Sequence, residues 1–156
     1  GIASGMPLGV MMSRADIMDW VPGSHASTFG GNPVCIAAAL ATLDVIEKEN
    51  LLQNSAEVGA YMLKRMADWT KKHRIVGDVR GRGLMIGVEI VKDQKTKEYG
   101  AELRDRIVEL AFERGILFLG CGPSTVRIAP PLVVTKDEAD AAIDALEESI
   151  EIAGKA

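Results

Sequence analysis

The chain has 156 residues and a formal net charge of -4, with 47% hydrophobic and 26% charged residues. This composition predicts a globular protein with a real core, built on aliphatic residues because only 4% of the chain is aromatic. The lack of a concentrated cationic face argues against nucleic-acid binding, and no apolar stretch is long enough to span a bilayer.

The first part of the chain predicts one short strand followed by turns. The apolar run "PLGVMMS", Pro7–Ser13, is typical of a buried strand. Residues 14–20 alternate charged and apolar side chains over one or two helical turns. Residues 21–31 are rich in turn formers, of which Pro22-Gly23 is the strongest pair.

A pair of helices follows. Asn32 is a favoured N-cap residue, and Pro33 suits the first helical position, where its missing N–H costs nothing. Apolar residues then recur at helical spacing until "EKEN" interrupts them, and Leu51-Leu52 restart the pattern. The second run ends in Lys71-Lys72-His73, cations that suit a helix C-terminus. The pattern predicts two helices joined by a bend near Asn50.

From about Ile75 the sequence predicts a compact α+β layer. Alternating apolar residues between glycines predict paired strands with a hairpin at 80–83, and residues 101–114 predict an amphipathic helix that a glycine ends. "ILFLG", "CGPST" and "VRIAPPLVV" then predict a strand, a loop and a strand. Thr135 and Glu138 have the capping-box spacing of a final helix.

The first half, in contrast, does not close on itself. One strand and long helices with apolar faces need other strands that this chain does not contain. The chain starts at Gly1 with apolar rather than polar residues, and we expect this start to lie in the middle of a larger buried region.

The stretch "HASTFGGNPVC", His25–Cys35, sets two adjacent hydroxyls and two adjacent glycines directly before a helix. One interpretation is a loop with a well-made helix cap. The other is an anion site, since convergent neutral donors in a small, glycine-lined space hold a phosphate well. The stretch by itself leaves both interpretations open.

Four blocks of the chain resemble, in order and spacing, the C-terminal part of the class III aminotransferases, which include 4-aminobutyrate, acetylornithine and ornithine aminotransferases. The blocks are "GIASGMPLG", "HASTFGGNPVCIAAALATLDVIEKENLL", "VRGRGLMIGVEI" and "VRIAPPLVVTKDE". The resemblance implies an α/β fold, the fold-type I of pyridoxal-phosphate (PLP) transferases. It implies that residues 1–74 end the large PLP-binding domain and include interdomain helices, and that residues 75–156 form the C-terminal α+β small domain.

The same resemblance implies roles for individual residues. Ser27 and Thr28 match a pair that grips the phosphate of pyridoxal 5'-phosphate across the dimer interface, in the neighbouring subunit's site. Arg127 matches the arginine that pairs with a substrate carboxylate, which suits its planar fork; an ordinary ion pair within the small domain is the alternative. For Arg80 and Arg82 we favour a structural role, as surface or interface pairs.

The family's Schiff-base lysine directly precedes the first block, so it is expected immediately before Gly1, and no lysine of this chain matches it. The chain is therefore expected to carry no catalytic residue and no metal ligands of its own. We expect it to be the C-terminal portion of an enzyme whose upstream part supplies the lysine.

The expected reaction moves an amino group from an amino acid or ω-amino acid (4-aminobutyrate-like) to a 2-oxo acid such as 2-oxoglutarate. A racemase or epimerase on the same scaffold is the alternative, and a non-catalytic assembly module is the alternative for the chain alone. The expected partners are the upstream part of the protein, further copies in a homodimer or higher homo-oligomer, and small amino and 2-oxo acids. Two cysteines, Cys35 and Cys121, and no secretion signal favour a cytoplasmic location.

Overall fold

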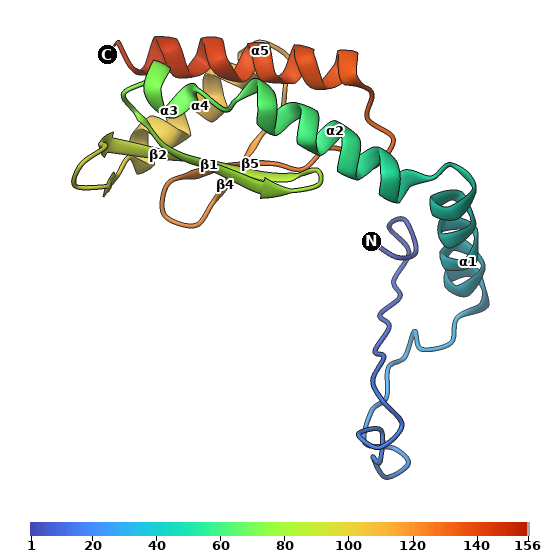
Figure 1. The fold of residues 1–156 in the computed structure, drawn as a ribbon. Helices are drawn as coiled ribbons and strands as arrows, with labels where there is room; N and C mark the ends of the chain where they lie inside the picture. Colours follow the sequence, from blue (N-terminus) through green and yellow to red (C-terminus); the bar gives the residue numbers. More distant parts are fainter. Residues whose placement is uncertain (156) are drawn as a thin grey trace. The chain divides into compact units, whose positions relative to one another are not determined.

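The computed structural model describes residues 1–155 and divides into two compact units, Gly1–Leu51 and Leu52–Ala156 (Figure 1). The first unit contains α1 (Pro33–Lys48). The remaining elements are, in chain order, α2 (Leu51–Arg65), α3 (Trp69–Lys72), β1 (Val76–Arg82), β2 (Met85–Asp93), β3 (Glu98–Tyr99), α4 (Ala101–Glu113), β4 (Leu119–Cys121), β5 (Thr125–Ile128) and α5 (Lys136–Ala153).

The strand expected at Pro7–Ser13 is wrong. This run has no strand pairing, and the side chains of Val10 and Met12 are 64% and 91% exposed. A strand needs a neighbour for its backbone N–H and C=O groups, and the paired strands within residues 1–155 all lie in the second unit. The run has the composition of a buried strand without a sheet to join.

Helix α1 begins and ends where its local signals predict. The Asn32 side-chain oxygen accepts hydrogen bonds from the backbone N–H of Val34 at 2.9 Å and of Cys35 at 3.2 Å. The helix ends at Lys48, and Asn50 has a φ of +52°, which breaks the helical path before α2 begins. The bend predicted near Asn50 is confirmed.

The second unit is built on an antiparallel sheet in the order β1-β2-β5-β4, with β3 pairing a further part of β2. Two local hairpins, β1–β2 and β4–β5, form its halves. They join where β5 pairs with β2, with Gly87 opposite Arg127 and Val88 opposite Val126. Because α4 lies between β2 and β5 in the chain, this central pairing is the least local contact of the sheet.

One face of the sheet is covered by helices, which Figure 1 shows together on the same side. Along β2, Ile86, Val88 and Ile90 are buried, while the intervening Gly87 and Glu89 are half-buried. This period of two is the pattern of a strand with one covered face. The core under the helices is completed by residues from each helix of this unit, among them Met62, Trp69, Ile107, Ile143, Leu146 and Ile150.

The β1–β2 hairpin touches α2 through two glycines. Gly83 turns the hairpin with a φ of +55°, and the N–H of Leu84 donates to the Ser55 hydroxyl at 3.4 Å. A Cβ atom placed on Gly59 would lie 2.1 Å from the carbonyl oxygen of Gly83. Glycine at position 59 therefore lets the helix backbone meet the hairpin backbone directly.

The other helix signals are confirmed as well. Helix α4 ends at Glu113, and Gly115 follows with a φ of +82°. Thr135 and Glu138 form the predicted capping box at the start of α5: the Thr135 hydroxyl accepts from the Glu138 N–H at 3.2 Å, and the Glu138 carboxylate accepts from the Thr135 N–H at 2.8 Å.

The expected domain boundary between residues 74 and 75 falls inside the second unit, because α2 and α3 contribute Met62 and Trp69 to the same core as the sheet. The assignment of residues 1–74 to a large domain stays a prediction. Within the residues that the structure describes, no helix is both long enough and apolar enough to cross a membrane.

Candidate functional site

The candidate substrate site lies on the uncovered face of the sheet. Arg127 is exposed on β5 between the buried residues Val126 and Ile128, so its side chain stands on the face that the helices leave open. Its cross-strand neighbours are Gly87 on β2 and Leu119 on β4. An arginine with glycine on one side and an exposed leucine on the other has room around its guanidinium.

Arg127 makes no ion pair and no side-chain hydrogen bond within the described chain. The ion pairs that do form nearby use Arg80 instead. The alternative interpretation of Arg127, an ordinary ion pair within the small domain, is therefore not realised among residues 1–155. A planar cation without a partner suits a carboxylate, which it can contact through two parallel hydrogen bonds.

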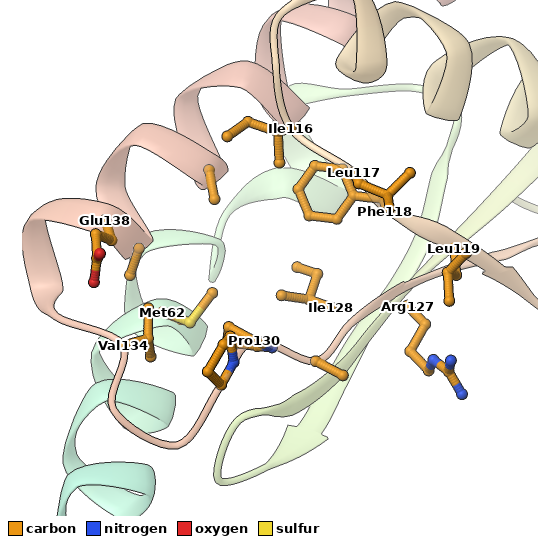
Figure 2. A pocket seen from close by; sticks show the side chains of 14 residues that line it. Met62, Ile116, Leu117, Phe118, Leu119, Arg127, Ile128, Pro130, Val134 and Glu138 are labelled. Atoms are coloured by element: carbon orange, nitrogen blue, oxygen red, sulfur yellow. The ribbon is translucent and has the colours of Figure 1, made fainter. Parts of the chain in front are cut away.

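A cavity of about 330 Å³ opens beside Arg127 (Figure 2). Its wall is largely apolar and comes from the segment before β4, from the loop after β5 and from α5. Figure 2 shows Phe118, Ile128 and Pro130 around the cavity, with the Arg127 guanidinium pointing away from them. The cation thus stands at the margin of the apolar space, where a charged group stays solvated.

Arg80 has two acidic partners on the same open face. One of its terminal nitrogens, Nη1, donates to Asp78 Oδ2 and to Glu89 Oε2, each at 2.9 Å. The hydrogen bond to Asp78 first, and that to Glu89 second, raise the pKa of Arg80 above its ordinary value. The structural interpretation of Arg80, a surface ion pair, is confirmed.

The second candidate site is the loop before α1. The backbone N–H of Gly30 donates to the carbonyl of Ser27 at 3.0 Å, which closes a turn around Thr28. The next turn runs from Phe29 to Asn32, through a Gly31 with a φ of +74°. The side chains of Ser27 and Thr28 are exposed, and in the part of the chain that is described neither hydroxyl forms a hydrogen bond.

The N-terminus of α1 has no donor to spare for an anion. The Asn32 side-chain oxygen accepts hydrogen bonds from the backbone N–H groups of Val34 and Cys35, and the Asn32 backbone carbonyl accepts one from the N–H of Ile36. Pro33 has no N–H group. Any anion held here must therefore use the loop. A cavity of about 400 Å³ beside it is lined by residues of both the loop and the segment 7–11, with Ser27 among them and Thr28 outside.

Two further residues lie at the edges of these features: His25 lines the cavity beside the Ser27 loop, and Cys121 lies on β4 two residues beyond Leu119. His25 sets its ring 6.2 Å from that of Trp20, centroid to centroid, and forms no side-chain hydrogen bond within residues 1–155. Cys121 is exposed at the end of β4. The described chain contains no group of three or more His, Cys, Asp or Glu side chains that could hold a metal ion.

Comparison with known proteins shows to which family the chain belongs. The model of the family described as "Aminotransferase class-III" matches residues 1–150. The chain belongs to the class III aminotransferase family. Among its relatives, an alanine/serine racemase of Pyrococcus horikoshii is 45% identical over 152 residues, which is 96% of this chain and 32% of the racemase. A mitochondrial alanine–glyoxylate aminotransferase 2 homolog of Arabidopsis thaliana is 43% identical, over 96% of this chain and 32% of the plant protein.

The structures agree with the family. An amine transaminase from an uncultivated Pseudomonas species, solved with PLP bound, superposes with a TM-score of 0.80 and 37% identity, over 85% of this chain and 30% of the transaminase. The class III chain thus spans about a third of the length of these proteins. Its fold is part of fold-type I, and the cofactor of the family is pyridoxal 5'-phosphate.

The loop at Ser27 and Thr28 fits the phosphate of that cofactor. It offers two hydroxyl groups without a partner in the described chain, and a turn in which a Cβ atom on Gly30 would lie 3.1 Å from the Ser27 carbonyl oxygen. Phosphate is held well by several neutral donors on a tight, glycine-containing loop. Ser27 and Thr28 have these donors, and their assignment to the phosphate remains a proposal.

Sequence reasoning missed the neighbours of Arg127 in this class III chain. Gly87, Glu89 and Leu119 reach the same face only through the order and register of the strands. Strand alternation along "LMIGVEI" places Gly87 and Glu89 on one face. This alternation does not predict that β5, rather than another strand, pairs with β2 beside these two residues.

Proposed function

We propose that the complete protein is a PLP-dependent transaminase, in which this chain supplies the anchor for the substrate carboxylate and the donors for the cofactor phosphate. The observation that carries the proposal is Arg127: on a class III scaffold, its guanidinium stands exposed at the margin of an apolar cavity and without a partner in the described chain. Bound PLP would supply the electron sink that makes the bond to the α-hydrogen of the substrate labile.

Arg127 would bind and orient the substrate. Two parallel N–H···O contacts fix a carboxylate in both position and plane, which a single point charge does not. Both partners of a transamination, the amino acid and the 2-oxo acid, carry such a carboxylate. The same residue therefore serves both half-reactions.

Ser27 and Thr28 would hold the cofactor in place rather than take part in proton transfer. Hydroxyl and backbone N–H donors to a phosphate are charge-assisted hydrogen bonds, which are stronger than neutral ones. We propose that they act in the site of a neighbouring subunit, and that the lysine which would bind the cofactor lies upstream of Gly1.

The proposed donor is an amino acid or an ω-amino acid of the 4-aminobutyrate type, and the proposed acceptor is a 2-oxo acid such as 2-oxoglutarate. The class III family and the transaminase structures support amino transfer in general.

A racemase or epimerase is the second candidate, because the alanine/serine racemase is 45% identical over nearly the whole chain. Both reactions require the same carboxylate anchor and the same cofactor. They differ in whether the amino group leaves with the cofactor or stays on the substrate carbon.

Assembly is part of the proposal. Helix α1 leaves apolar side chains exposed on more than one of its sides, and exposed apolar surface of this kind marks contact with partner surfaces. These side chains are Val34 at 63%, Ile36 at 41%, Leu40 at 60%, Leu43 at 44% and Val45 at 42% exposure. We propose that the upstream part of the protein and a second subunit cover them, in a homodimer or larger homo-oligomer in the cytoplasm.

The test uses the full-length protein with PLP. Incubation of L-alanine or 4-aminobutyrate with 2-oxoglutarate should form L-glutamate, whereas conversion of L-alanine to D-alanine without a 2-oxo acid would favour the racemase. Arg127→Ala should weaken carboxylate substrates by about 2–4 kcal/mol in kcat/KM, and Arg127→Lys should not restore them. The half-reaction with an amine that lacks a carboxylate should be unaffected. Equal losses on both classes of donor would contradict the assignment.

A further inference from the structure

The open face of the sheet holds a second charged group within reach of Arg127. Glu89 lies on β2 two residues beyond Gly87, on the same face, and directly opposite Thr125. It therefore stands diagonally across from Arg127. Diagonal neighbours on one face of an antiparallel pair are about 7–8 Å apart, which two long side chains can span.

Glu89 also stands diagonally across from Arg80, on the other side of β2. Arg80 lies opposite Gly87 in the β1–β2 pairing, and the structure shows this diagonal pair formed, with Arg80 Nη1 2.9 Å from Glu89 Oε2. The Glu89 side chain is 22% exposed, compared with 57% for Arg80. A carboxylate that is partly removed from water is costly without a cation beside it.

Glu89 thus has two possible partners and uses one of them. Gly87 contributes no side chain between the two arginines; the nearest side-chain atom there is the methyl carbon of Thr125, 3.0 Å from where a Cβ atom on Gly87 would lie. Asp78 and Glu89 both pair with Arg80, so neither of these two carboxylates is paired with Arg127. The guanidinium of Arg127 is left for another anion.

We propose that Arg80 is a positioning residue: by holding Glu89, it keeps this carboxylate off Arg127 and leaves Arg127 open to the carboxylate of the substrate. The inference rests on the proposed role of Arg127 in substrate binding. Without Arg80, Glu89 becomes an internal competitor that occupies the anchor before the substrate arrives.

The first test measures the guanidinium of Arg127 itself and needs no catalysis. In the full-length protein, phenylglyoxal modification of Arg127 is followed by peptide mass spectrometry, because an arginine in an ion pair reacts more slowly than a free one. Arg80→Gln should slow the modification about two- to sixfold, because an exposed ion pair of ordinary strength with Glu89 would leave about a half to a sixth of the Arg127 side chains free to react.

Three further variants separate this effect from a general disturbance of the sheet. The double variant Arg80→Gln/Glu89→Gln should restore the rate of modification, since the competitor is gone. Glu89→Gln alone and Asp78→Asn should leave the rate of Arg127 modification unchanged. Glu89→Gln removes the competing carboxylate, and in Asp78→Asn Arg80 still pairs with Glu89. An unchanged rate in Arg80→Gln, or a slow rate that the second substitution fails to restore, would overturn the inference.

Kinetics then separate the inference from the proposed function. Arg80→Gln should raise KM for a carboxylate donor by the same factor of about two to six with kcat unchanged, and the double variant should reverse it. A variant that slows modification of Arg127 but leaves KM for carboxylates unchanged would show that Glu89 does move while Arg127 is not the substrate anchor. That result would overturn the proposed function, and with it the functional part of the inference.

Discussion

The contact between α2 and the β1–β2 hairpin provides a sharp test of the fold, through Gly59→Ala. On helix propensity alone, this change should stabilise α2 by about 0.8–1.0 kcal/mol. The added Cβ atom, however, would lie 2.1 Å from the Gly83 carbonyl oxygen and 2.3 Å from its carbonyl carbon. Both obstacles are backbone atoms, so neither can be moved by a change of rotamer.

The size of the effect follows from the overlap. Carbon–oxygen contacts in proteins begin at about 3.3 Å, so the helix and the hairpin would have to separate by about 1.2 Å. Overpacking of a core costs about 1–3 kcal/mol, and a displacement of backbone belongs at the upper end of that range. After the gain in propensity of about 1 kcal/mol, we expect a net loss of about 2 kcal/mol in the free energy of unfolding.

The assay is urea unfolding followed by the fluorescence of Trp69, which is 1% exposed in the core of the second unit. A Trp20→Phe background removes the other tryptophan of the chain. Ala60→Gly, at the neighbouring exposed position of α2, is the matched control and should cost only the propensity difference of about 1 kcal/mol. A Gly59→Ala variant that is as stable as the parent, or more stable, would show that the helix and the hairpin do not meet as described.

Three further predictions concern polar contacts. Gln94→Ala removes an amide nitrogen that lies 2.7–3.2 Å from three backbone carbonyls in and after α3, and should lower the free energy of unfolding in urea by about 1–3 kcal/mol, with the exposed Gln53→Ala as control. Burial raises the pKa of Glu147, but hydrogen bonds from Lys72 and His73 outweigh it and hold that pKa below its ordinary 4.5. The stability this gives is complete above pH 4.5 and is lost as pH falls through the lowered pKa, so Glu147→Gln should flatten the acid limb of a plot of unfolding free energy against pH. In the full-length protein, Thr28→Ala should weaken PLP binding by about 1.5–3 kcal/mol in equilibrium dialysis, and an unchanged affinity would contradict the phosphate role.

Features that depend on a few neighbouring residues could be predicted from the sequence. The Asn32 cap, the break near Asn50 and the capping box at Thr135 each bring together groups within four residues of one another, so their chemistry is visible in the chain itself. The hairpin near Gly83 belongs to the same class, because a turn with positive φ selects glycine.

Features that depend on distant residues could not be predicted in this way. Pro7–Ser13 has the composition of a buried strand, but a strand exists only with a neighbour, and composition does not supply one. Arg127 could be singled out as a cation between apolar strand residues. Its lack of an ion pair within the described residues, and the pairing of Glu89 with Arg80, follow from the strand order and from side-chain geometry.

The central pairing of β2 with β5 also sets the order in which the open face can form during folding. Each hairpin, β1–β2 and β4–β5, closes a short loop and can form early, whereas joining them requires closing the longer loop that contains α4. Arg80 and Gly87 belong to one hairpin, and Leu119 and Arg127 to the other. The proposed carboxylate anchor and its surroundings therefore depend on the least local pairing of the sheet, so a chain in which β5 has not yet paired with β2 can be rich in native secondary structure and still lack this face.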